Sequence, residues 1–184
     1  MGAELGSKEL GLLHELVPMA HAVAMIVNPK NQNAMNQIAE VQEAARTLRQ
    51  QLTVLNASTE QEIDVAFNSV TQRGISTLVV GADGFFRDRR DQIIALAARR
   101  GIVTVYPYRE YPDVGGLMSY GPDLYDLYRQ LGMYTGRVIK GQKPADLPVM
   151  RSTKFELVIN LKTARTLGVE IPPGVLAIAD EVIE

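Results

Sequence analysis

The chain has 184 residues, of which 46% are hydrophobic and 22% are charged, a composition typical of a soluble globular domain large enough to bury a core. A net charge of -2 gives no general attraction to polyanions, so a nucleic-acid partner is not expected. The absence of cysteine excludes disulfides, thiol nucleophiles and thiolate metal sites, and it leaves the redox compartment open.

The first residues carry no leader signal. After Met1 there is neither a basic region nor an apolar run long enough for a secretory signal or a membrane span. We therefore expect either a cytoplasmic protein or a chain that lacks its leader. The sequence leaves open whether Met1 is the true start.

Hydrophobic periodicity predicts an alternation of helices and strands. An amphipathic helix over residues 5–17 carries leucines on one side and stops at Pro18. Strands separated by single helices predict a doubly wound parallel sheet, an α/β fold with helices on both faces. The predicted strands are 21–27, 52–55, 75–80 and 102–106, and the predicted helices are 34–50, 59–73 with a capping box at Ser58 or Thr59, and one from about 87 to Gly101.

The stretch from Gly115 to Asp123 interrupts this alternation. A short apolar strand over 117–120 is bracketed by glycines, and Pro122 suits the first turn of a helix that continues to Lys140. Two interpretations stay open: a crossing between two parts of the protein, or an ordinary edge strand with glycine turns. Beyond the helix we expect an extended connection over 143–152, a strand over 155–159, a helix over 161–167 and a helical tail over 173–182.

Residues for enzymatic chemistry are few. The chain has two histidines, no Gly-x-Ser-x-Gly sequence and no phosphate-binding glycine loop after its first strand. Asp83, at a strand end, is a candidate general base or nucleophile, and a loop cap bonded to nearby backbone is the alternative. We therefore predict no enzyme, no cofactor and no metal.

The residues of the loops at the strand ends fit a binding function better than an enzymatic one. Doubly wound folds bind ligands at the carboxyl ends of their strands. Polar side chains there lie next to helix N-termini, which favour a ligand carboxylate by about 0.3–1 kcal/mol. Asp83 suits a ligand ammonium, and the tyrosines suit stacking. The alternatives are that the asparagines only cap turns and that Arg109 only pairs with Glu110 in solvent. The predicted ligand contacts are Asn28, Asn31, Asn33, Ser58, Asp83, Tyr106, Tyr108, Ser119 and Tyr120.

Several ordered motifs resemble the ABC-transporter substrate-binding protein family related to tryptophan and tyrosine uptake. The resemblance runs nearly end to end. It rests on Asn28-Pro29 with Asn31 and Asn33, Ala57 to Glu60, Val79 to Phe86, Arg89 to Ile93, Tyr108 to Glu110, Gly115 to Gly121 and Phe155 to Ala164.

The resemblance implies a type I periplasmic binding protein, with two doubly wound lobes, three crossings and an amino-acid-like ligand held between the lobes. It also implies a periplasmic or extracytoplasmic location and ABC permease subunits as partners. The chain then corresponds to the carboxy-terminal lobe alone, without an amino-terminal lobe or signal. Its parts would be a lobe over 1–121, a crossing helix and connection over 122–152 that packs on the other lobe, and returning segments over 153–184.

The leading hypothesis is a solute-binding component of an ABC importer. A ligand-sensing effector lobe of a regulatory protein and a small hydrolase using Asp83 are the alternatives. For the chain alone, an apolar stripe on the helix 122–140 predicts a homodimer, because that stripe has no partner lobe. The stripe consists of Leu124, Leu127, Tyr128, Leu131, Val138 and Ile139. Folding of this helix back onto its own sheet is the alternative.

Overall fold

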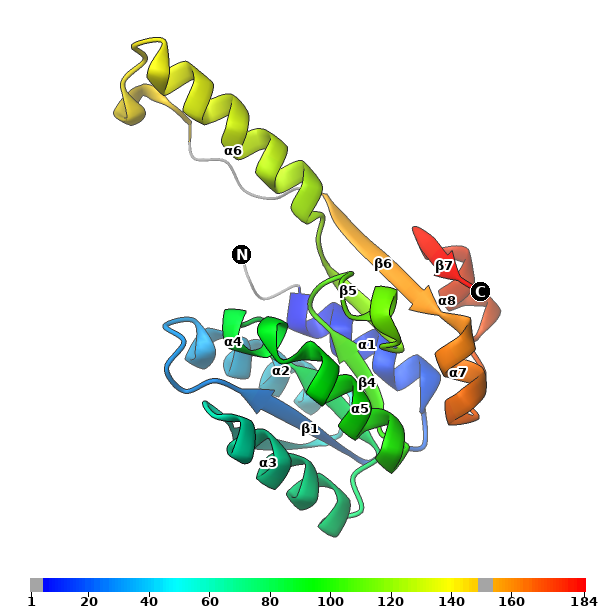
Figure 1. The fold of residues 1–184 in the computed structure, drawn as a ribbon. Coiled ribbons are helices and arrows are strands. Elements are labelled where there is room, and N and C mark those ends of the chain that lie inside the picture. The colour runs from blue at the N-terminus through cyan, green and yellow to red at the C-terminus, as the bar shows by residue number, and fades with distance from the viewer. Residues whose placement is uncertain (1–4, 149–153) are drawn as a thin grey trace.

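A single seven-stranded sheet organises the computed structural model, which describes residues 5–148 and 154–184 (Figure 1). The strand order is β2-β1-β3-β4-β5-β6-β7. The strands are β1 Ala22–Val27, β2 Gln51–Asn56, β3 Thr77–Val80, β4 Val103–Tyr106, β5 Met118–Pro122, β6 Phe155–Asn160 and β7 Glu181–Ile183.

The first five strands run parallel, as predicted from the alternation of strands and helices. The strand β6 is antiparallel to β5, because the chain leaves the sheet along β5 and returns beside it. The strand β7 then pairs with β6 in parallel. The predicted doubly wound sheet is confirmed, with a mixed extension at one edge.

Helices cover both faces of this sheet (Figure 1). Alternate residues of β1 point to opposite faces, with Val23 and Met25 in one core and Ala24 and Ile26 in the other. The face with Val23 and Met25 is covered by α1 Leu5–Leu16 and α2 Ala34–Thr47, and near the returning strands by α7 Leu161–Leu167 and α8 Pro173–Ala177. The opposite face is covered by α3 Glu60–Gln72, α4 Gly84–Asp88 and α5 Arg90–Arg100.

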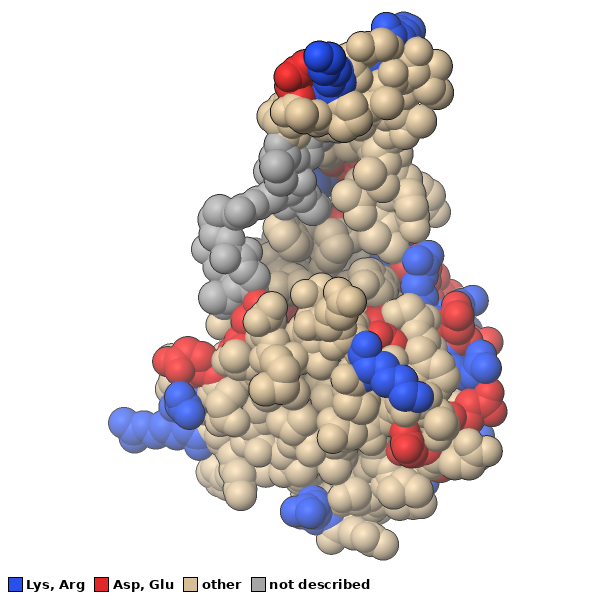
Figure 2. Space-filling model, turned by 90° about the vertical axis from the view of Figure 1, so that its left-hand side faces the viewer, with Lys and Arg blue, Asp and Glu red and all other residues tan. Residues whose placement is uncertain are grey.

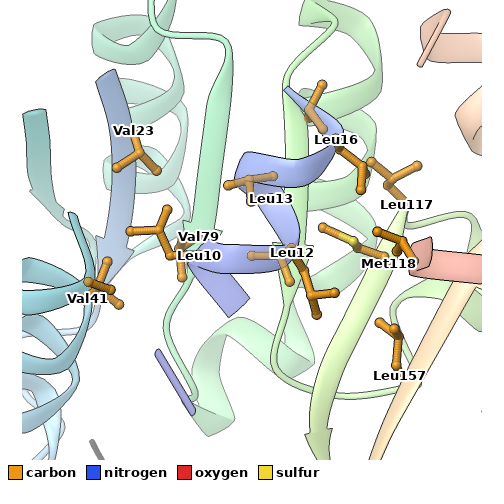
Figure 3. Packing of buried hydrophobic residues seen from close by; sticks show 14 of the residues in the cluster. Leu10, Leu12, Leu13, Leu16, Val23, Val41, Val79, Leu117, Met118 and Leu157 are labelled. Atoms are coloured by element: carbon orange, nitrogen blue, oxygen red, sulfur yellow. The ribbon is translucent and has the colours of Figure 1, made fainter. Parts of the chain in front are cut away.

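The helix α1 is an integral part of the first core (Figure 3). Its residues Leu10, Leu13 and Leu16 are at most 8% exposed and pack in one cluster with Val79 of β3 and Leu117 beside β5. Burying each such side chain is worth about 1.5–3 kcal/mol. The amphipathic helix predicted for residues 5–17 is therefore confirmed, and it anchors the start of the described chain to the sheet.

Helix ends follow the sequence signals. Thr59 begins α3, and its hydroxyl oxygen accepts a hydrogen bond from the Glu62 backbone nitrogen at 3.2 Å. The Glu62 carboxylate accepts hydrogen bonds from the Ser58 backbone nitrogen at 2.6 Å and from the Ser58 hydroxyl at 3.0 Å, and these two bonds lower the Glu62 pKa. Gly74 and Gly101 follow α3 and α5 in the left-handed conformation that ends helices.

The structure corrects three expectations in the second half of the chain. Pro122 ends β5 instead of starting a helix, and Asp123 caps the helix by accepting a hydrogen bond from the Asp126 nitrogen at 3.0 Å. The edge-strand alternative is wrong because β5 lies between β4 and β6. The predicted tail over 173–182 is not one helix, because Asp180 exchanges two hydrogen bonds with Leu157 and turns the chain into β7.

The helix α6, Leu124–Ile139, projects away from the sheet (Figure 1). All its residues are described, and none is buried; Tyr125 is 76% exposed and Ile139 is 80% exposed. The helix therefore does not fold back onto its own sheet. The described residues also form two short 3-10 helices, η1 Pro112–Val114 and η2 Pro144–Asp146. Residues 149–152 of the predicted extended connection lie outside the described residues.

An apolar hollow of about 530 Å³ lies between α6 and the segment that follows it. The lining comes from the predicted apolar stripe of α6 together with the prolines of the return segment. The lining residues are Leu127, Gln130, Leu131, Tyr134, Thr135, Val138, Ile139, Pro144, Leu147 and Pro148.

Candidate functional site

The loops at the carboxyl ends of the parallel strands gather at one edge of the sheet. Figure 2 looks onto this side of the molecule, and most of the face below α6 is uncharged, with acidic and basic side chains toward its margins. A mostly uncharged face of this kind suits a ligand with no large net charge.

Asp83 joins two of these loops. Its Oδ1 accepts hydrogen bonds from Asn28 Nδ2 at 3.0 Å and from the Phe85 backbone nitrogen at 2.9 Å. Its Oδ2 accepts from Asn31 Nδ2 at 2.8 Å. Three of the predicted site residues therefore meet, and the carboxylate is occupied as a helix cap and a link between loops. This arrangement favours the loop-cap alternative for Asp83 over a catalytic role.

The side chain of Gln37 completes this cluster, and sequence reasoning missed it. Its Oε1 accepts from the Ala82 nitrogen at 2.7 Å, and its Nε2 donates to the Ala82 carbonyl at 3.1 Å. The available signal was a polar residue on the inward side of α2, between Ala34 and Val41. The space enclosed by the cluster is too small for a water molecule, so a ligand would lie on its outer surface.

A second group at this edge combines charge and aromatic surface. The Arg87 guanidinium lies 5.9 Å from the centre of the Tyr108 ring and pairs with Glu110 at 2.6 Å. Its pKa is raised, first by a hydrogen bond with Tyr128 of α6 and also by Glu110. Burial raises the pKa of Tyr108. The alternative that Arg109 only pairs with Glu110 in solvent is wrong, because Glu110 forms an ion pair with Arg87.

Two predicted contacts lie inside the sheet. Tyr106 is 1% exposed and stacks on Tyr111 with ring centres 4.6 Å apart, and burial raises its pKa. Ser119, also 1% exposed, lies opposite Tyr106 in the β4–β5 register. Its Oγ has no hydrogen-bond partner among the described residues. Neither side chain is exposed at the edge formed by the carboxyl ends of the strands.

The remaining predicted contacts are dispersed. Asn33 precedes α2 and is exposed, without a capping hydrogen bond from its side chain. The Ser58 hydroxyl donates to Glu62 at 3.0 Å. The Tyr120 ring is half-buried and stacks on Phe155, with ring centres 6.0 Å apart on the two strands that lead to α6. The Asn33 backbone nitrogen donates to Asn31 Oδ1 at 2.9 Å, so Asn33 borders the Asp83 cluster through its backbone. The side chains of Ser58 and Tyr120 have their partners elsewhere.

A buried carboxyl group lies near the same edge. Glu9 of α1 is 6% exposed, and its charge acts on Tyr108. Its pKa is raised well above the ordinary value of 4.5, first by burial and then by the Glu40 carboxylate. Between pH 4.5 and the raised pKa, the Glu9 carboxyl is therefore protonated in the folded chain and ionised in the unfolded chain. The stability that depends on this proton is complete below pH 4.5 and is lost as pH rises through the folded pKa.

Replacing Glu9 with glutamine should therefore stabilise the chain at high pH only. We expect Glu9→Gln to raise the free energy of unfolding by about 1–3 kcal/mol near pH 8, the usual cost of a buried polar group that lacks compensation, and to change it little near pH 4. Urea denaturation at both pH values measures the difference. Glu15→Gln, exposed on the same helix, is the control. An effect of Glu9→Gln that is equal at both pH values would contradict the assignment.

Among residues 5–148 and 154–184, no group of three or more acidic or histidine side chains is arranged to hold a metal ion. Within the same residues, no helix is long and apolar enough to cross a membrane.

The doubly wound sheet, its loop-lined edge and the projecting helix define the class of the protein, an α/β fold like the lobes of periplasmic binding proteins. Within this class, the chain belongs to the family described as ABC transporter substrate binding protein, whose model matches residues 3–183. The family resemblance is confirmed, and with it a substrate-binding class instead of an enzymatic one. No curated protein matches the chain.

Solved structures share this fold. The ABC domain in complex with L-Trp from Streptococcus pneumoniae is 24% identical, with a TM-score of 0.89, and the match covers 97% of this chain and 62% of that one. A conserved domain protein from Vibrio cholerae is 22% identical, with a TM-score of 0.88 and coverage of 96% and 60%. The periplasmic solute binding protein from Actinobacillus succinogenes with bound D-allose is 15% identical, with a TM-score of 0.63 and coverage of 85% and 59%. The chain thus spans about three fifths of the length of these structures.

Proposed function

We propose that this chain is a solute-binding part of an ABC importer and holds an amino acid or a related small molecule at the carboxyl ends of its strands. The proposal rests on the hydrogen bonds by which Asn28, Asn31 and Asp83 hold two strand-end loops together, beside the half-buried Tyr108. These hydrogen bonds fix the loops before a ligand arrives, which lowers the entropy lost on binding.

The ligand class is part of the proposal. The relative with L-Trp supports an amino acid, and the relative with D-allose shows that the same fold also holds a sugar. An aromatic surface at Tyr108 and a largely uncharged edge suit a zwitterion with an apolar body. The family match favours this importer function over the effector lobe of a regulatory protein.

Location and partners follow from the family as proposals. We place the protein outside the cytoplasm, with ABC permease subunits as its partners. The lobe over 1–121 would hold the ligand edge, and the crossing region over 122–152 would pack on a second lobe where one is present. The segments over 153–184 return to the first lobe. For the chain by itself, we propose a homodimer through α6.

Ligand titration tests the proposed function. A complete protein with micromolar affinity binds with about 8 kcal/mol, and losing half of that leaves roughly millimolar binding. We therefore expect isothermal titration calorimetry to detect weak, saturable binding of one or more amino acids, with L-tryptophan as the first amino acid tested. D-allose serves as the sugar for comparison. Tyr108→Ala should weaken this binding at least about tenfold, a loss near 1.4 kcal/mol.

The control variant is Met19→Ala, an exposed residue that precedes β1 and so lies at the opposite edge of the sheet, and it should bind as the parent chain does. Sub-micromolar binding to the monomer would contradict the division of contacts between two lobes. Binding that survives Tyr108→Ala unchanged would contradict the site.

A further inference from the structure

Arg109 contacts three carboxylates at once. Its Nη2 lies 2.8 Å from Glu181 Oε2, its Nη1 lies 3.2 Å from Glu156 Oε2, and its Nε lies 3.5 Å from Asp113 Oδ2. The Arg109 side chain is 21% exposed and that of Glu156 is 13% exposed. A partly buried guanidinium that donates to several carboxylates is held much more firmly than an exposed ion pair.

These contacts join parts of the chain that are far apart in sequence. Arg109 follows β4 in the loop that also carries Tyr108 of the ligand edge. Glu156 lies in β6, opposite Gly121 of β5, and Glu181 begins β7. Arg109 therefore connects the site loop with both strands that extend the parallel sheet.

The helix α6 lies between β5 and β6 in the chain, so these two strands connect it to the sheet. Where the two strands leave the sheet, the Asp123 nitrogen donates to the Lys154 carbonyl at 3.0 Å, and Lys154 Nζ lies 2.7 Å from Asp123 Oδ2. Beyond this point none of the residues of α6, all of them described, is buried. Tyr128 of α6 also forms a hydrogen bond with Arg87 of the lobe. The direction of α6 relative to the sheet therefore depends on the base of the β5–β6 pair together with this contact.

We propose that Arg109 is a positioning residue that fixes the angle between α6 and the lobe, by holding the loop after β4, β6 and β7 as one unit. The same contacts link Tyr108 in the site loop to the strands of the crossing. The proposal concerns the angle of α6 and holds whether or not a ligand is identified.

Distance measurements between spin labels test this proposal. The chain has no cysteine, so Gln72→Cys on α3 and Lys140→Cys after α6 give two unique labelling sites on exposed residues. Double electron–electron resonance on labelled chain diluted with unlabelled chain reports the distance within one molecule. We expect Arg109→Gln to about double the width of the distance distribution, because the contacts that select one orientation are gone.

The control is Arg129→Gln, which removes an ion pair with Asp126 that lies wholly within α6, and it should leave the distribution unchanged. Circular dichroism verifies that each variant is folded. A folded Arg109→Gln with the parent distribution overturns the proposal. If Arg109→Gln does not fold, Glu156→Gln decides: a broader distribution supports the proposal, and an unchanged one overturns it.

Discussion

Gly121→Ala is expected to destabilise the chain by about 4 kcal/mol or more, the range that marks a severe steric or packing defect. A β-carbon at this position would lie 1.9 Å from the Pro107 carbonyl oxygen and 2.9 Å from the Pro107 carbonyl carbon. Both are backbone atoms, so no side-chain rotation can relieve the contact. The strand β5 would have to move from its pairs with β4 and β6, or the loop after β4 would have to leave the sheet.

Urea denaturation followed by circular dichroism measures this effect. The matched control is Gly136→Ala on α6, where a β-carbon has no neighbour within 4 Å. This control should raise stability slightly, because alanine exceeds glycine in helix propensity by about 1 kcal/mol. A Gly121→Ala chain within about 1 kcal/mol of the parent would show that the strand and the loop separate easily, contrary to the packing described above.

The purified chain is expected to be a homodimer that assembles through α6. The stripe on this helix includes Tyr128, Leu131 and Ile139, which are 59%, 54% and 80% exposed. Burying each large apolar side chain contributes about 1.5–3 kcal/mol, and six of them would contribute roughly 10 kcal/mol, comparable with the stability of a whole domain. The hollow of about 530 Å³ beside the stripe leaves room for side chains of a second copy.

Light scattering on Leu127→Asp, Leu131→Asp measures the interface, and this double variant should be monomeric. The control is Met133→Asp, because Met133 lies on the opposite side of α6 and is itself 45% exposed. It should remain a dimer. A parent chain that is monomeric at high concentration, or a double variant that stays dimeric, would exclude this helix as the interface.

The amino-acid sequence by itself determined the parallel sheet. Apolar runs of four to seven residues, helical stripes between them and capping residues such as Thr59 are local signals, and each agrees with the final fold. The edge proposed for the ligand is also predicted from the sequence, because parallel strands end on the same side of a sheet. This rule brought Asn28, Asn31 and Asp83 together correctly.

The tertiary structure alone decided which side chains reach that edge. Tyr106 and Tyr108 are equivalent as residue types, yet Tyr106 turns into the core and stacks on Tyr111, whereas Tyr108 stays half-buried beneath Arg87. Both rings pack against the same core, but Tyr106 is the last residue of β4 and Tyr108 lies in the loop beyond it. The point where the strand ends and the loop begins therefore decides how deeply each ring is buried, and the residue type does not specify it.

The tertiary structure also decided the ion-pair partners of Arg109 and Glu110 and the formation of the last strand, β7. Arg109 and Glu110 are neighbours in sequence, but the chain takes Arg109 toward β6 and β7 and Glu110 toward Arg87. The strand β7 has three residues, too few for a periodic signal, and it forms because β6 offers an unpaired edge and Asp180 binds Leu157. Charges and short strands of this kind are selected by groups distant in sequence, so only the folded chain fixes them.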